Sequence, residues 1–150
     1  MEIFKKYKVL LVLALVVIVG VFLFFSRMYH NDIKALEGFL ASYETYDKVI
    51  SDFSISKTDD LESKAGDALI ELNTKATFRL SSLIKNDAEL MDQALEAADL
   101  ARRELESLKI YRSGIQSQNA DLDGLAEECR VLTGKRKASF ARFQGLSGTH

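Results

Sequence analysis

The sequence has no proline and no tryptophan, and it has only one cysteine and two histidines. Without proline, no helix is interrupted by a residue that lacks a backbone donor. Because Cys129 is alone, an intramolecular disulfide is impossible, and the fold must be held by packing. A lone cysteine in an oxidising compartment is either buried or bonded to another chain. The apolar neighbours of Cys129 favour a buried thiol over an intermolecular disulfide.

The two histidines lie in poor places for catalysis. His30 follows an apolar run and His150 is the last residue, so neither is expected on a core face beside a nucleophile. The HExxH, C-x-x-C, glycine-rich phosphate-loop and EF-hand patterns are also missing. Adjacent carboxylates such as Asp59 and Asp60 point about 100° apart on a helix and do not converge on one ion. We therefore expect no enzyme activity, no cofactor and no metal site.

A long apolar run is the most informative feature that is present. Residues 9–26 contain no charged side chain and are almost wholly apolar. As a helix they span about 27 Å, close to the roughly 30 Å thickness of a bilayer core. A cleaved secretory signal would have a shorter apolar region, of about 7–15 residues, and small residues at its cleavage site. Phe24, Phe25 and Ser26 end the run instead, so we predict a retained signal-anchor rather than a cleaved signal or a buried soluble helix.

Basic residues on either side of the run predict its orientation. Lys5, Lys6 and Lys8 precede it, whereas only Arg27 and Lys34 follow closely. Positive charge stays on the cytoplasmic side of a membrane. The predicted order is therefore a cytoplasmic N-terminus (1–8), a single-pass anchor in the cell (inner) membrane (9–26), a domain outside the cytoplasm (27–146) and a disordered tail (147–150). In a bacterium this domain would lie in the periplasm.

The residues after the anchor predict an all-α domain, because helix formers dominate and strand-like alternation is scarce. Apolar residues recur every three or four positions in four segments, at about 31–55, 59–85, 87–112 and 121–144. The four stripes are Leu36, Phe39, Tyr43, Tyr46, Ile50, Phe53; Ala65, Leu69, Leu72, Ala76, Leu80, Leu83; Leu90, Ala94, Ala98, Ala101, Leu105, Leu108; and Leu122, Leu125, Cys129, Leu132, Phe140, Phe143.

The second and third stripes stay in phase, which leaves two architectures open. In one, residues 60–112 form a single helix of a long hairpin or coiled coil. In the other, the chain turns at Asn86, where Glu89 three residues later resembles a capping box, and Gly114 stops the third helix. A second helix that returns to the membrane arrives near residue 85, and the charges beyond it cannot enter lipid. We therefore predict the turn, and an antiparallel, up-down-up-down four-helix bundle.

Charge is distributed unevenly over the domain. Acidic side chains outnumber basic ones between residues 31 and 129, whereas residues 130–150 hold five cations and no acid. This end suits the dipole of the last helix, and it also suits a separate anionic partner or an anionic membrane surface. The predicted surface contact comprises Lys135, Arg136, Lys137, Phe140, Arg142 and Phe143. Nucleic acid is not an expected partner, because the domain is predicted to lie outside the cytoplasm.

Three roles fit this organisation. The first is a membrane-anchored structural or interaction subunit that contacts membrane lipid and docks onto another membrane or envelope protein or onto itself. A helical bundle growing from a first transmembrane helix is also similar to the receptor domains of chemoreceptors and histidine kinases, which implies a ligand-binding sensor. Those receptors continue into a second span and a cytoplasmic output, whereas this chain ends at His150. Length and anchor topology are similar to phage inner-membrane spanin-type lysis proteins as well. We favour the first role.

We predict that the anchor is retained and that the C-terminus lies outside the cytoplasm. Mass spectrometry of the mature protein should find residues 1–26 still attached. A reporter that works only in the cytoplasm should be active when fused to the N-terminus and inactive when fused to the C-terminus, because the lysines before the run stay inside. An active C-terminal fusion would contradict the orientation.

Overall fold

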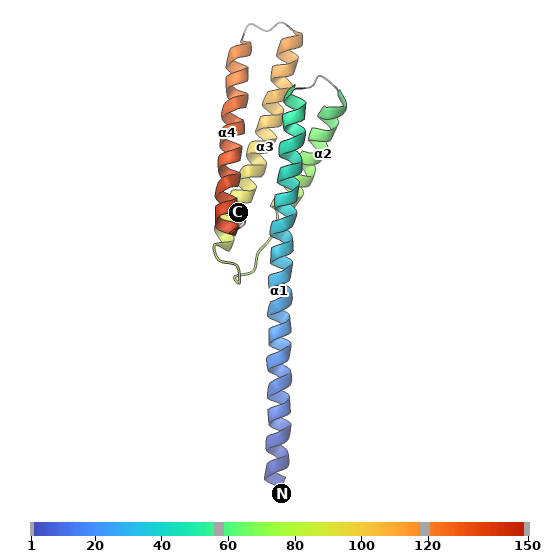
Figure 1. The fold of residues 1–150 in the computed structure, drawn as a ribbon, viewed down its shortest axis with the longest axis vertical. Coiled ribbons are helices and arrows are strands. Elements are labelled where there is room, and N and C mark those ends of the chain that lie inside the picture. Colours follow the sequence, from blue (N-terminus) through green and yellow to red (C-terminus); the bar gives the residue numbers. More distant parts are fainter. Residues whose placement is uncertain (1, 56–58, 118–120, 149–150) are drawn as a thin grey trace.

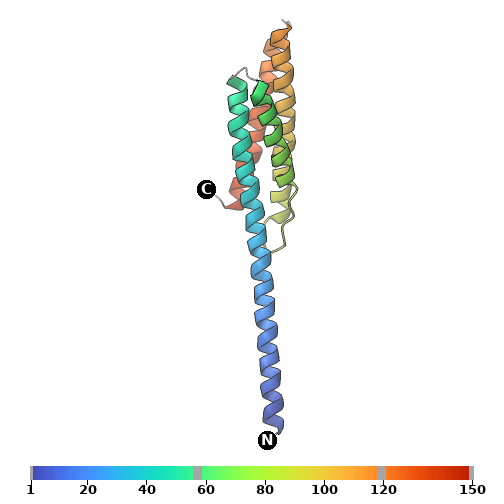
Figure 2. The same ribbon diagram turned by 90° about the vertical axis from the view of Figure 1, so that its right-hand side faces the viewer.

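The computed structural model describes residues 2–55, 59–117 and 121–148. Within these ranges the chain forms four α-helices and no strand, which confirms the all-α prediction. The helices are α1 (Glu2–Ile55), α2 (Asp59–Ala76), α3 (Asp87–Gln116) and α4 (Leu122–Ser147). Figure 1 shows that the C-terminal half of α1 lies beside the other three helices, while its N-terminal half projects alone. Figure 2 shows the same projection from the side.

The helix α1 is continuous over 54 residues, which gives it a length of about 80 Å. Its large apolar side chains between Leu10 and Phe25 are exposed on every side, and Phe22 is 71% exposed. A helix that is apolar all round needs an apolar environment. Among the described residues, α1 is the one helix long and apolar enough to cross a membrane. It also has no break at residues 27–31, where the apolar run gives way to a one-sided pattern.

The core lies against the second half of α1. The predicted stripe of this helix is buried as expected, with every member at most 5% exposed. The predicted stripe of α3 is buried too, and its alanines allow α4 to pack closely on it. In α4, Cys129, Phe140 and Phe143 are buried, whereas Leu122, Leu125 and Leu132 are only half-buried. Every member of the predicted stripes of α1 and α3 is therefore buried.

Two predicted helix ends in this part of the chain are wrong. Gly114 does not stop α3, because it is buried inside a helix that continues to Gln116. The end is made by Ser117, whose backbone N–H and hydroxyl both donate to the carbonyl oxygen of Ser113, at 3.0 and 2.9 Å. The predicted disordered tail begins inside α4, which ends at Ser147 with Gly148 in the left-handed conformation. Residues 149–150 lie outside the described residues.

The chain leaves the helical path between α2 and α3, so the alternative of one helix over 60–112 is wrong. Asn86 directly precedes α3 and has a φ of 61°, a left-handed conformation that asparagine tolerates. The predicted capping box is not formed, because the Asn86 side chain makes no cap hydrogen bond. Instead, the carboxylate of Asp87 accepts a hydrogen bond from the backbone N–H of Ala88 at 2.8 Å.

The helix α2 ends at Ala76, well before the predicted end at residue 85. Hydroxyl and amide side chains near this end compete for the helix carbonyls. The Asn73 amide donates to the Leu69 carbonyl oxygen, and the Thr77 hydroxyl donates to that of Thr74, both at 2.9 Å. Leu80 and Leu83 of the predicted stripe therefore lie outside any helix, and Leu83 is exposed.

The segment 77–86 is held against α1 instead. The ring of Phe78 lies 6.0 Å from that of Phe39 and 6.4 Å from that of Phe143. The carboxylate of Asp32, only 6% exposed, accepts the backbone N–H of Ser81 at 3.2 Å and also the Ser81 hydroxyl. Since a buried carboxylate needs partners, these bonds tie the segment to the start of the core.

We predict that an aspartate at position 50 unfolds the domain. Ile50 is 3% exposed in the core, whereas Ile110 is 57% exposed on α3. Ile50→Asp should cost about 3 kcal/mol or more, because it buries an unpaired carboxylate. Ile110→Asp, the matched control, should change stability by no more than about 0.5 kcal/mol. Urea unfolding of the full chain in detergent measures both, and equal midpoints would show that the core face of α1 is misassigned.

Candidate functional site

The most unusual site is a buried arginine between three helices. Arg136 on α4 and Glu104 on α3 are each 1% exposed. The Nε of Arg136 donates to Oε2 of Glu104 at 2.5 Å. Its Nη2 donates to Oδ1 of Asp47 and its Nη1 to the hydroxyl of Tyr43, both at 2.7 Å. One guanidinium therefore links α4 to both α1 and α3.

The surrounding groups complete this network. The Thr133 hydroxyl lies 2.5 Å from Oε1 of Glu104, and the Tyr46 hydroxyl donates to the carbonyl oxygen of Ala101 at 2.7 Å. The guanidinium carbon of Arg136 lies 5.2 and 5.3 Å from the ring centres of Tyr43 and Tyr46, within cation–π range. In the described ranges, no buried side-chain nitrogen or oxygen lacks a hydrogen-bond partner. The site is thus satisfied by the protein itself.

The surroundings of Arg136, Tyr43 and Tyr46 keep each of these groups in a single protonation state. Burial raises the pKa of Tyr43 to about 12, although the nearby Arg136 opposes this shift. Burial also raises the pKa of Tyr46. Burial alone would lower the pKa of Arg136, but the charge of Glu104, the interaction with Tyr43 and the hydrogen bonds to Glu104 and Asp47 together outweigh it, so the pKa lies above its usual value. The guanidinium is therefore charged and both phenols are neutral at physiological pH, so none of the three suits proton transfer.

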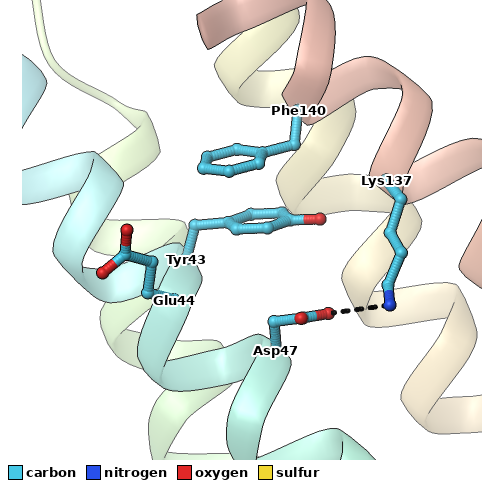
Figure 3. Close-up of a pocket in the computed structure, with 5 residues that line it drawn as sticks. All are labelled: Tyr43, Glu44, Asp47, Lys137 and Phe140. Atoms are coloured by element: carbon cyan, nitrogen blue, oxygen red, sulfur yellow. Dashed lines mark ion pairs between the residues drawn. The ribbon is translucent and has the colours of Figure 1, made fainter. Parts of the chain in front are cut away.

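A small hollow lies beside this network, between α1 and α4. It has a volume of about 230 Å³ and is lined by Tyr43, Glu44, Asp47, Lys137 and Phe140. Figure 3 shows the ring of Phe140 stacked on that of Tyr43, with ring centres 3.4 Å apart, and Lys137 reaching toward Asp47. Ligand pockets typically measure about 300–1,000 Å³. The hollow is smaller than these, and its two opposite charges already face each other at 3.9 Å.

The predicted surface contact of the basic end divides into two groups. Lys135, Lys137 and Arg142 are exposed, so their contact with an anion stays a prediction. Arg136, Phe140 and Phe143 are buried among the helices and require correction. Their charge and rings serve the interior, because α4 turns this face toward α1 and α3.

The height of the basic end above the membrane also matters. Lys137 lies beside Asp47, which follows Ser26 by twenty-one residues on the unbroken α1. At about 1.5 Å per residue this is roughly 30 Å beyond the apolar run. The Debye length is only about 8 Å at physiological ionic strength. Lys137 therefore stands too far from the predicted anchor to feel a lipid surface strongly.

Cys129 lies next to the network and is 7% exposed. Burial raises the pKa of its thiol, and the carboxylates of Glu128 and Glu104 add to the shift. The prediction of a buried thiol is confirmed. An intermolecular disulfide would need this sulfur to leave the core, so the structure does not favour that alternative.

Reading only the apolar residues missed both partners of the ion pair. Glu104 lies three residues after Ala101 and four before Leu108, in step with the buried stripe of α3. Arg136 lies midway between Leu132 and Phe140 in the stripe of α4, four residues from each. Both charged residues therefore occupy positions of the apolar repeat of their helices, and this placement was the sequence feature that could have predicted the buried ion pair.

Comparisons with other proteins give no information on the function of this site. The chain matches no protein-family model, and no curated protein or solved structure is significantly similar to it. In the part of the chain that the structure describes, no group of three or more His, Cys, Asp or Glu side chains could hold a metal ion. The arrangement around Arg136 can join three helices in one register, and this is the chemistry that its contacts support.

We predict that Arg136 and Glu104 depend on each other. Arg136→Met should cost about 3–5 kcal/mol, because it leaves the buried Glu104 carboxylate without its counter-charge. Adding Glu104→Leu should recover most of that loss, since apolar residues often replace a buried pair at little cost. Lys135→Met, at an exposed position of the same helix, is the matched control. Urea unfolding compares the four proteins, and an Arg136→Met variant as stable as the control would contradict the structural role.

Proposed function

We propose that this protein is a single-pass membrane protein whose helical domain acts as a structural or interaction subunit outside the cytoplasm. The N-terminus faces the cytoplasm and the domain stands in the periplasm or at the cell exterior. It docks there onto another envelope protein or onto a second copy of itself. Catalysis has no part in this role.

The single observation that carries the proposal is the continuity of α1. One helix is exposed and apolar all round in its first half and buried along one face in its second half. A continuous helix transmits position and orientation from the membrane to the domain, which a flexible linker would not do. Such a rigid mount suits a subunit that presents a surface at a constant height.

The arrangement of the helices supports an antiparallel bundle as the mounted domain. Along the colour order of Figure 1, α1 leads away from the N-terminus, α2 returns, α3 leads away again and α4 returns. Residues from all four helices contribute to one buried cluster. The connections from α1 to α2 and from α3 to α4 are short, as in up-down-up-down bundles, whereas α2 and α3 are joined by the longer segment 77–86.

The interior supports a structural role over a sensor role. The charged groups between the helices bind one another, with Arg136 contacting Glu104, Asp47 and Tyr43. The hollow beside them is only about 230 Å³ in volume. A ligand in this hollow would therefore have to displace satisfied interactions to gain little buried area.

Crosslinking in native membranes tests the interaction role. Full-length protein should give a discrete crosslinked species, at twice the monomer mass for self-association or at another defined mass for a partner. The matched control is the anchor alone, residues 1–30, which should give no such species. If the full chain runs only as a monomer, or if the anchor alone gives the same species, the domain is not the interacting part.

A further inference from the structure

The segment 77–86 lies at the membrane-facing end of the domain. Figure 1 shows it extending below the lower ends of α3 and α4, toward the projecting half of α1. Asp32 of α1 holds it there through the backbone N–H and the hydroxyl of Ser81. Its depth is therefore fixed relative to the apolar run of the same helix.

That depth can be estimated along α1. Asp32 follows Ser26, the last residue of the apolar run, by six residues, or about 9 Å of helix. The headgroup region of a bilayer adds roughly 5–7 Å on each side of the hydrocarbon core. Because the segment descends below the α3 terminus, its lowest part reaches the height of lipid headgroups.

A turn that begins at Ser81, the residue bound by Asp32, presents an apolar side chain. The backbone N–H of Ile84 donates to the carbonyl oxygen of Ser81 at 3.2 Å, which closes a turn with Ser82 and Leu83 at its tip. Polar residues and glycine normally occupy such tips. Leu83 is 41% exposed, while its neighbours Leu80 and Ile84 pack on the core. An exposed leucine at a turn tip offers apolar surface that lipid would cover.

Charges around the turn suit phosphate groups. Arg79 and Lys85 flank the turn and are exposed, and Arg27 is exposed on α1 where the apolar run ends. The carboxylate of Asp32 is engaged by Ser81, and that of Asp87 accepts the N–H of Ala88 in the first turn of α3. These two carboxylates thus bind groups of the protein, while the three cations are exposed to solvent.

We propose that segment 77–86 is a second membrane contact, in which Leu83 inserts among lipid headgroups and Arg79 and Lys85 bind lipid phosphates. This inference rests on the proposed anchoring of α1. The contact braces the domain on the membrane at a point away from the anchor itself. Lys137 of α4 lacks such a place, since it stands about 30 Å beyond the apolar run.

Single tryptophans test the contact cleanly, because the natural chain contains none. Leu83→Trp reports the turn, and Ile110→Trp is the control, about 35 Å along α3 from its start at Asp87. Val16→Trp reports the anchor. Each full-length variant is placed in nanodiscs with lipids brominated near the headgroups or along the tails, and emission is measured. The buried Cys129 must stay unreactive to maleimide in each, as proof of folding.

We expect headgroup-brominated lipid to quench Leu83→Trp and to leave Ile110→Trp unchanged. The Leu83→Trp quenching should be stronger in anionic than in neutral nanodiscs, and Arg79→Gln with Lys85→Gln should remove this difference. If tail-brominated lipid quenches Val16→Trp while headgroup-brominated lipid leaves Leu83→Trp unquenched, the second contact is overturned but the anchor is not. Unquenched Val16→Trp would overturn the proposed anchoring itself. Equal quenching of Leu83→Trp in anionic and in neutral nanodiscs would overturn the phosphate-binding role of Arg79 and Lys85.

Discussion

The domain takes its position from a helix that continues well beyond the end of its apolar run. Around Ser26 the side chains of α1 change from apolar on all sides to apolar on one side, while the helix continues to Ile55. Backbone hydrogen bonds between residues four apart carry the helix across this change. The distance of each residue of α1 from the end of the apolar run then follows from the number of residues between them. Asp32 lies near the lipid headgroups in the proposed orientation, and Asp47 lies far above them.

Two kinds of contact join the remaining helices to one another and to α1. Small side chains bring α3 and α4 together, with four alanines of α3 almost fully buried. Long side chains join α4 to α1, where Arg136 reaches Asp47 and Tyr43 and the ring of Phe143 lies 4.7 Å from that of Phe39. A buried ion pair adds little net stability over apolar packing. It does penalise any register that separates the partners, so here it selects one alignment of α1, α3 and α4.

The sequence predicted much of the helical fold, because helix periodicity is a local property. The buried stripes of α1 and α3 were readable from apolar spacing. The break before α3 was not, because the stripes stay in phase across it, and it was predicted instead from the charges that cannot enter lipid. The end of α2 was not, since Leu80 and Leu83 continue its pattern in sequence. Asp32, forty-nine residues away from Ser81, takes the backbone group that a longer helix would use. Such a tertiary bond leaves no trace in the spacing of apolar residues.

The buried pair escaped prediction for a different reason. Charges on a helix are expected in solvent, so Arg136 read as part of a basic surface with Lys135 and Lys137. Its place in the stripe of α4 became meaningful only once Glu104 was found opposite it. A pairing between two helices cannot be derived from either helix alone. The candidate site was therefore less predictable than the fold that carries it.

The continuity of α1 across the membrane boundary is the central claim, and amide hydrogen exchange tests it most directly. The full chain in nanodiscs should show slow exchange at every amide from residue 24 to 34. The amides of the non-helical segment 77–86, apart from the hydrogen-bonded Ser81 and Ile84, are the fast-exchanging internal reference. Helical hydrogen bonds protect these amides whether lipid or water surrounds them. Fast exchange confined to residues 27–31, at a rate similar to the reference, would reveal a hinge and contradict the account.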